Sequence, residues 1–168
     1  MKDSAGFDAF YAATQRRVQH QMYAMTSNLA DAQELTQEAY ARAWQRWSTV
    51  ETYDDPEAWV RTVALNSVRH GWRHASVVRR YQAKVPGPQG PVEVGPEHVA
   101  IVRALEEVDA DQREVVVLHY LADLPVADIA AQLGIPQGTV KSRLSRARDR
   151  LAGLLDDTGD DREELRHV

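Results

Sequence analysis

One stretch decides how this chain folds: GTVKSRLSRARDRL, residues 138–151. Its apolar residues recur every three or four positions, which is the spacing of one face of an α-helix. These residues are Val140, Leu144, Ala147 and Leu151. The rest of the stretch carries five Lys and Arg side chains against a single acid, Asp149. The pattern predicts an amphipathic helix with an apolar face toward a core and a basic face toward solvent.

A second amphipathic segment precedes this basic helix. It runs from Val126 to Leu133, after Pro125, and ends at Gly134, which tolerates the positive φ of a helix end. Helix, glycine turn and basic helix follow one another as in a helix-turn-helix, whose second helix enters the major groove of DNA. A solvated basic helix on a small core is the alternative. The agreement of turn glycine, apolar register and charge favours DNA binding.

The outward side chains of the basic helix suit two kinds of DNA contact. Long cations reach guanine edges and small serines allow close approach, so we predict base contacts from Lys141, Ser142, Ser145 and Arg146. Arg143, Arg148 and Arg150 are better placed for phosphates, which position a protein without specifying sequence. Thr139, at the start of the helix, completes the predicted set.

The composition of the chain excludes several classes of site and of protein. The chain has 168 residues, a net charge of −5 and no cysteine, which excludes disulfides and thiolate metal sites. We see no signal peptide and no apolar run near the ~20 residues that span a bilayer, so we expect a cytoplasmic protein without membrane insertion. The six His residues lack metal-ligand spacing and no glycine-rich phosphate loop is present. We therefore predict no catalytic residues, no metal, no cofactor and no enzyme activity.

Proline and glycine divide the chain. Residues 85–96 hold four Pro and three Gly, a density that no helix or central strand survives. We predict an all-α protein of two small helical domains, an N-terminal helical bundle and a C-terminal helix-turn-helix domain. The predicted boundaries are 1–82 and 98–155 for the domains, 83–97 for the linker and 156–168 for an acidic, disordered tail.

Capping residues place the expected helices. In the N-terminal domain we expect helices at 7–25 and 31–47, the second with Asp31 as its cap and Glu34 at the capping-box position. A polar loop follows at 48–55, and Asp55 caps a further helix that begins at Pro56 and reaches about residue 74 or beyond. In the C-terminal domain we expect a helix from about Glu97 and another capped by Asp111.

A second basic strip lies in the N-terminal half. Residues 61–80 contain five Arg and two His but no acid, and Trp59, Trp72 and Tyr81 are interleaved with them. Arginine beside aromatic rings suits single strands and unstacked bases. Each Trp alone is more simply a core residue, and for the strip as a unit the two interpretations are evenly balanced.

The predicted helix at 31–47 carries a polar face. Glu34, Gln37 and Glu38 share it, and Arg42 follows Glu38 by four residues, a favourable ion-pair spacing. Trp44 lies off the main apolar stripe, where an exposed ring can anchor a protein partner. An ordinary amphipathic surface helix is an equally good interpretation of these residues.

Four stretches in this order resemble a known family. They are residues 34–44 (ELTQEAYARAW), 58–66 (AWVRTVALN), 128–134 (DIAAQLG) and 138–148 (GTVKSRLSRAR). Together with the linker position they resemble bacterial RNA polymerase sigma factors of the sigma-70 family. The resemblance is to the small extracytoplasmic-function (ECF) type in its actinobacterial style. It implies a region 2-like domain before the linker and a region 4-like domain after it.

The resemblance implies a role for each surface. Glu34, Gln37, Glu38, Arg42 and Trp44 would bind the clamp helices of the largest subunit of core RNA polymerase, and the flap region would be a further contact. The helix-turn-helix residues Thr139, Lys141, Ser142, Arg143, Ser145, Arg146 and Arg148 would read the −35 element of promoter DNA as duplex. An anti-sigma factor would be a further partner.

The same resemblance assigns the −10 element to the N-terminal domain. A specificity loop would capture a flipped base; it comprises Ser48, Thr49, Val50, Glu51, Thr52, Tyr53, Asp54 and Asp55. The following helix would melt and hold the non-template single strand through Trp59, Arg61, Thr62, Asn66, Arg69 and Arg73. The linker would thread toward the active-site cleft of the polymerase.

Two other classes of function compete with this interpretation. A conventional dimeric helix-turn-helix regulator would bind duplex DNA at a palindrome without polymerase. An adaptor that binds only proteins would keep its function when Lys141 and Arg146 are replaced by alanine. A sigma factor would instead bind DNA weakly alone and direct transcription when it is added to core polymerase.

Overall fold

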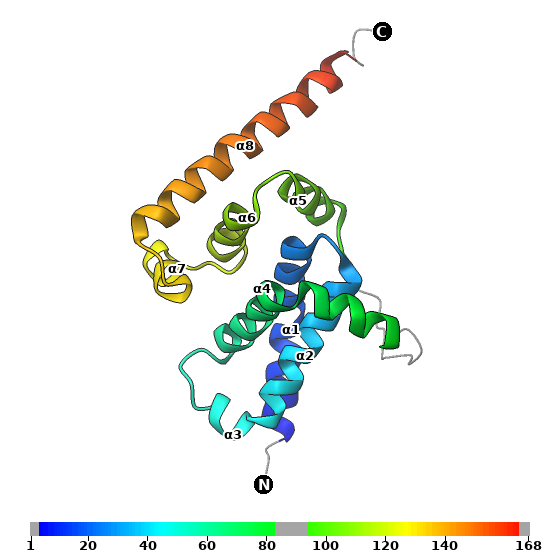
Figure 1. Cartoon of the computed structure of the whole chain (residues 1–168), viewed down its shortest axis with the longest axis vertical. Coiled ribbons are helices and arrows are strands. Elements are labelled where there is room, and N and C mark those ends of the chain that lie inside the picture. The colour runs from blue at the N-terminus through cyan, green and yellow to red at the C-terminus, as the bar shows by residue number, and fades with distance from the viewer. Residues whose placement is uncertain (1–3, 83–93, 165–168) are drawn as a thin grey trace. The chain divides into compact units, whose positions relative to one another are not determined.

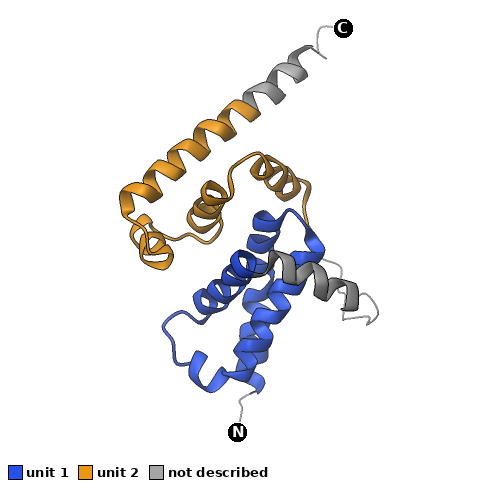
Figure 2. Ribbon diagram, viewed as in Figure 1, with its two compact units in different colours: residues 1–93 blue, residues 94–168 orange. Residues whose placement is uncertain are grey.

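The computed structural model describes the backbone of residues 4–82 and 94–164 and the side chains of residues 4–70 and 94–154. The chain divides into two compact units, Met1–Glu93 and Val94–Val168, and this division falls inside the predicted linker (Figure 2). Residues 83–93 of that linker lie outside the described residues. Every regular element of the described ranges is helical, as the sequence predicts (Figure 1).

Unit 1 contains α1 (Ser4–Thr26), α2 (Leu29–Gln45), the single turn α3 (Trp47–Val50) and α4 (Pro56–Gln82). Helices α1 and α2 lie side by side and α4 packs against both (Figure 1). Their shared core is buried completely or nearly so; it includes Val18, Met22, Ala32, Leu35, Ala39, Ala43, Val60, Ala64 and Leu65.

The start of α2 differs from the prediction. Asn28, not Asp31, is the N-cap, and its Oδ1 accepts a hydrogen bond of 3.0 Å from the Asp31 amide. Ser27 ends α1 with a φ of 55°, so that Ser27 and Asn28 alone connect the two helices. The predicted cap was wrong because Asn28 lies three residues earlier and satisfies the same free amide groups.

The cap of α4 is confirmed. The Asp55 carboxylate accepts a hydrogen bond of 3.0 Å from the Ala58 amide, and Pro56 occupies the first turn. The loop before it is shorter than the predicted 48–55, because Trp47–Val50 form a helical turn. Trp47 holds this turn in place, since its ring lies 5.4 Å from that of Phe7 and 5.1 Å from that of Phe10.

Unit 2 contains α5 (Pro96–Glu106), α6 (Ala110–Val116), the π-helical turn η1 (Val117–Leu121), α7 (Val126–Leu133) and α8 (Gln137–Glu164). Helix α8 contacts α5, α6 and α7. Asp109, rather than the predicted Asp111, precedes the first residue of α6, and its side chain makes no capping hydrogen bond. The backbone of α8 is helical as far as Glu164, where the sequence predicted disorder from residue 156.

The turn between α7 and α8 depends on Gly134. Its φ of 65° and ψ of 34° lie in the left-handed region, which glycine adopts without a steric cost. The next residue closes the turn, because the Ile135 amide donates to the Ala130 carbonyl at 3.1 Å. The predicted helix-turn-helix is therefore present, with α8 as its second helix.

Candidate nucleic-acid interface

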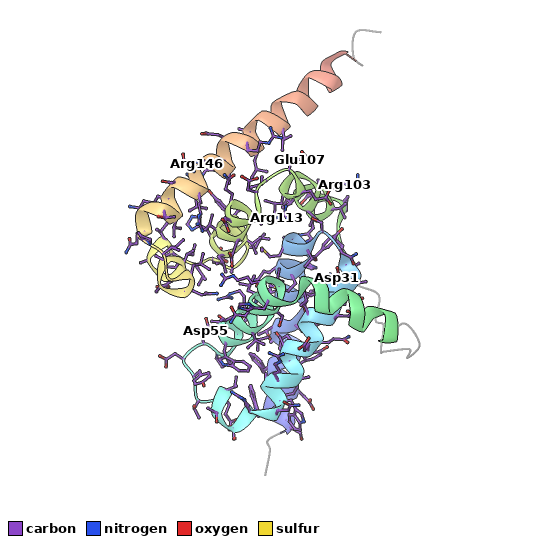
Figure 3. The ribbon with its side chains drawn as sticks, in the orientation of Figure 1. Asp31, Asp55, Arg103, Glu107, Arg113 and Arg146 are labelled. Carbon is purple, nitrogen blue, oxygen red and sulfur yellow. The ribbon has the colours of Figure 1, made fainter. Side chains whose placement is uncertain are left out.

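Helix α8 separates its two faces as the sequence predicts. Val140, Leu144 and Ala147 are buried. The predicted DNA-contacting residues on the other side are exposed; they are Lys141, Ser142, Ser145, Arg146 and Arg148, with Arg146 labelled in Figure 3. The Ser142 hydroxyl donates to the Gly138 carbonyl at 3.0 Å, which leaves its oxygen free to accept from a ligand. This face presents cations and small hydroxyls together.

Two arginines of α8 are held by acids of the same unit. Arg143, which is half-buried, lies 4.0 Å from an Asp111 carboxylate oxygen. Arg150 lies 3.7 Å from the Glu107 carboxylate and also donates to the Glu107 carbonyl at 3.4 Å. Sequence reasoning assigned both arginines to phosphates and missed these pairs, because the acids lie more than thirty residues away along the chain.

Seven of the eight residues in the turn at 48–55 are exposed, but some of their polar groups already form hydrogen bonds within the protein. The Val50 side chain is buried, the Thr52 hydroxyl donates to the Thr49 carbonyl at 2.6 Å, and Asp55 caps α4. Tyr53 is 44% exposed, which is high for an aromatic ring. The remaining exposed residues of the turn are Ser48, Thr49, Glu51 and Asp54.

Helix α4 presents a polar stripe beside this turn. Trp59, Thr62, Asn66 and Arg69 follow one another at steps of three or four residues, so they lie along one side of the helix. Asn66 and Arg69 are exposed, whereas Trp59 and Thr62 are half-buried. Arg73 has the same spacing, but its side chain lies outside the described residues, as do those of Trp72 and Tyr81.

Arg61 points away from that stripe. It follows Trp59 by two residues, about half a helical turn, and it is only 3% exposed. Burial lowers the pKa of its guanidinium, while the charges of Asp55 and Glu57 act to raise that pKa. Its Nε atom has no hydrogen-bond partner among the described residues. Helical spacing in the sequence could have distinguished Arg61 from its neighbours, but the basic composition of the strip obscured it.

A bidentate ion pair joins α1 to the start of α4. The Arg17 guanidinium donates to both oxygens of the Glu57 carboxylate, at 2.9 and 2.8 Å. The hydrogen bond and the charge of Glu57 raise the pKa of Arg17. Sequence reasoning missed this pair, which holds the end of the 48–55 turn against α1.

The polar face of α2 is largely as predicted. Gln37, Glu38 and Arg42 are exposed, Glu34 is half-buried, and the Arg42–Glu38 ion pair forms at 2.7 Å. Trp44 is half-buried rather than exposed, because its ring packs 5.2 Å from that of Phe7. It belongs to a cluster of rings that also includes Phe10, Tyr11, Tyr40 and Trp47.

The described residues contain no cluster of three His, Cys, Asp or Glu side chains that could hold a metal ion. No helix in the described part of the chain is both long and apolar enough to cross a bilayer.

Comparisons with known proteins agree with this arrangement. The family model for Sigma-70 region 2 matches residues 10–77, and that for Sigma-70 region 4 matches residues 98–151. The RNA polymerase sigma-E factor of Streptomyces coelicolor is 36% identical over 128 residues, 72% of this chain and 70% of that protein. The ECF RNA polymerase sigma factor SigL of Mycobacterium tuberculosis is 34% identical over 142 residues, 80% of either chain.

Solved structures show the same fold. The sigma factor RpoE of Bartonella quintana, crystallised in complex with the anti-sigma factor NepR, superposes with a TM-score of 0.71 at 25% identity. The match covers 90% of this chain and 97% of that one. Two separate family regions in the expected order do not favour a dimeric helix-turn-helix regulator. The chain belongs to the ECF sigma factors of the sigma-70 family, which direct RNA polymerase to specific promoters.

Proposed function

We propose that the two units of this sigma factor handle two states of promoter DNA. In this proposal α8 reads the −35 element as duplex, while the 48–55 turn and the α4 stripe hold the opened −10 element. The single observation that carries the proposal is the exposed outer face of α8, where Lys141 and Arg146 flank small serines above a fully buried apolar line. The proposed −35 contacts are Thr139, Lys141, Ser142, Ser145, Arg146 and Arg148; Arg143, which the sequence also predicts to contact this element, is paired with Asp111 instead.

Major-groove chemistry supports the role of α8. Lysine and arginine donate hydrogen bonds to guanine O6 and N7, and a helix whose outer face carries serines can approach base edges closely. In a helix-turn-helix the N-terminal residues of the second helix contact base edges. Lys141, Ser142 and Ser145 all lie within the first three turns of α8, which begins at Gln137.

Stacking and charge support the role of unit 1. A half-buried Trp59 followed by exposed Asn66 and Arg69 offers a ring, an amide and a cation along one line. Unpaired bases bind such aromatic faces, and base binding offsets the few kcal/mol that unstacking costs. The exposed Tyr53 adds a ring at the 48–55 turn. Arg61 and Val50 support these surfaces from within, since both are buried.

The exposed face of α2 is the proposed polymerase contact. Gln37, Glu38 and Arg42 project from a helix that is fixed on its other side by Ala39 and Ala43 in the core. The clamp helices of the largest polymerase subunit are the proposed partner of this face, and the flap region is the proposed partner of unit 2. Trp44 lies at the edge of this proposed polymerase-binding face, because Phe7 packs against its ring.

The proposal extends to how the protein works in the cell. A net charge of −5 disfavours binding to DNA alone, so the polymerase supplies further contacts. The protein catalyses no reaction itself and acts in the cytoplasm, where the polymerase is. An anti-sigma factor is a further proposed partner, as in the Bartonella quintana complex.

Run-off transcription tests this function. Core polymerase, promoter fragments from a genomic library and nucleotides are combined with and without the protein. The proposal expects discrete transcripts only when the protein is present, and their loss with the Lys141→Ala/Arg146→Ala variant. Specific binding to a palindromic duplex without polymerase, together with no transcript from any fragment, would contradict it.

A further inference from the structure

One flank of α8 carries three arginines that share a line. Arg143, Arg146 and Arg150 are separated by three and four residues, so they lie on the same side of the helix. Lys141 and Arg148 lie on the opposite flank of the exposed face. A helix in a groove has a phosphate strand on each side, so either flank offers cations to phosphates.

Two of the three arginines on that flank are already engaged. Arg143 lies 4.0 Å from the Asp111 carboxylate, and Arg150 lies 3.7 Å from the Glu107 carboxylate and also donates a hydrogen bond to the Glu107 carbonyl. The two ion pairs are seven residues apart on α8, about 10 Å along the helix axis. Arg146 lies between them and makes no ion pair within the described part of the chain.

The two acids lie at the connection between α5 and α6, which further hydrogen bonds stabilise. Glu107 directly follows α5 and Asp111 is the second residue of α6, so both lie at the short connection between these helices. The Arg113 guanidinium binds carbonyls of the same connection, and Figure 3 labels Glu107 and Arg113. It donates to the Leu105 carbonyl at 2.8 Å and to the Val108 carbonyl at 3.0 Å. Arg113 therefore adds side-chain hydrogen bonds to carbonyls at the end of α5, where the helix leaves its last carbonyls without helical partners.

A carboxylate and a phosphate compete for the same guanidinium. Both are anionic oxygen acceptors that an arginine fork binds. We infer that Glu107 and Asp111 act as internal phosphate mimics, which hold Arg143 and Arg150 away from DNA phosphates and lower the sequence-independent affinity of α8 for duplex DNA. This inference rests on the proposed role of α8 in DNA binding.

The consequence is that a larger share of the DNA-binding affinity of α8 depends on the base sequence. Phosphate contacts add affinity for any sequence, whereas base contacts add affinity for one sequence. With two cations withheld, Lys141, Ser142, Ser145 and Arg146 carry a larger share of the binding. The sigma factor then depends on correct base contacts and on the polymerase, instead of binding DNA indiscriminately.

The salt dependence of DNA binding tests this inference. Each phosphate that a cation neutralises steepens the slope of log K against log salt by about 0.9. We expect the full-length Glu107→Gln/Asp111→Asn variant to bind a random-sequence duplex with a slope steeper by about 1.8. Between 50 and 200 mM salt, its affinity should fall about 12-fold more than that of the unsubstituted protein.

A matched control removes the same charge from the same connection. Glu106 and Asp109 are exposed, and neither forms an ion pair with a described residue, so Glu106→Gln/Asp109→Asn should leave the slope unchanged. The single Asp111→Asn variant, which removes the carboxylate that pairs with Arg143, should steepen the slope by about 0.9 even if the double variant folds poorly.

Variants of the two paired arginines complete a double-mutant cycle with the acid variants. Arg143→Ala/Arg150→Ala should leave the slope of the unsubstituted protein unchanged and abolish the gain in the Glu107→Gln/Asp111→Asn background. An unchanged slope in the acid variants, or an equal gain in the control, would overturn the inference. The duplex assay contains no polymerase, so a negative result in it can be distinguished from a negative result in the run-off assay that tests the proposed function.

Discussion

The buried apolar side chains described in unit 2 are all aliphatic, whereas unit 1 packs a group of aromatic rings that includes Phe10, Tyr40 and Trp47. In unit 2 the residues divide cleanly, with Val140 and Leu144 inside and Lys141 and Arg146 outside. In unit 1 a Trp is half-buried and an Arg is buried on the same helix. The comparison teaches that residue type predicts position where side chains are either aliphatic or charged, and fails where they are amphipathic.

The largest expected effect is in the aliphatic core of unit 2. Leu144 is 1% exposed, and Leu144→Ala should lower the free energy of unfolding of unit 2 by about 3 kcal/mol, because it removes buried methyl groups and leaves a cavity. Urea denaturation followed by circular dichroism measures this change. All four Trp lie in unit 1, so Trp fluorescence reports that unit separately. An exposed neighbour, Ser145→Ala, should change stability by less than about 0.5 kcal/mol; a similar loss there would contradict the assignment of faces.

The next effect concerns the turn between α7 and α8. Gly134 has a φ of 65° with open space around it, so Gly134→Ala should cost about 1–2 kcal/mol from backbone strain alone. Gly138 also has open space, but it lies inside α8 without a positive φ, so Gly138→Ala should instead stabilise by about 0.5–1 kcal/mol. Thermal unfolding of both variants gives the two signs, and an unchanged or higher stability of the Gly134→Ala variant would show that the turn does not depend on Gly134.

Helix caps compare the two units directly. The Asn28 side chain accepts a hydrogen bond at the start of α2, whereas that of Asp109 makes no capping bond at the start of α6. Asn28→Ala should therefore destabilise unit 1 by about 1 kcal/mol. Asp109→Ala should change the stability of unit 2 by less than about 0.5 kcal/mol. Chemical denaturation measures both, and a reversed order would refute the cap assignment.

The smallest effect comes from the buried arginine of unit 1. Arg61 is 3% exposed and its Nε has no partner in the part of unit 1 that the structure describes, so Arg61→Met should retain or raise the stability of unit 1, by up to about 1 kcal/mol. Urea denaturation followed by Trp fluorescence measures the change. Arg69→Met, on the exposed stripe of the same helix, should leave stability unchanged but weaken promoter opening, seen as reduced permanganate reactivity of unpaired thymines. Reduced opening with Arg61→Met at unchanged stability would instead place Arg61 on the DNA.

Local sequence patterns predicted more of the structure of unit 2 than of unit 1. The helix-turn-helix, its glycine turn and the exposed face of α8 follow from apolar spacing, the position of Gly134 and the distribution of charge, because these features depend on neighbours within a few residues. The pairs Arg143–Asp111 and Arg17–Glu57 join residues 32 and 40 positions apart, and no local pattern announces them. The two-residue spacing from Trp59 places Arg61 on the opposite, buried side of the helix. The basic composition of the segment instead suggested that all of its arginines are exposed.

Run-off transcription with the Lys141→Ala/Arg146→Ala variant tests the division of labour most directly. Core polymerase with this variant should lose the discrete promoter transcripts, while the variant should still bind core polymerase in a pull-down. A control variant, Arg16→Ala/Arg103→Ala, which removes two exposed cations from α1 and α5, should keep them. Transcripts of unchanged yield and start site from the Lys141→Ala/Arg146→Ala variant would contradict the claim that the outer face of α8 selects the promoter.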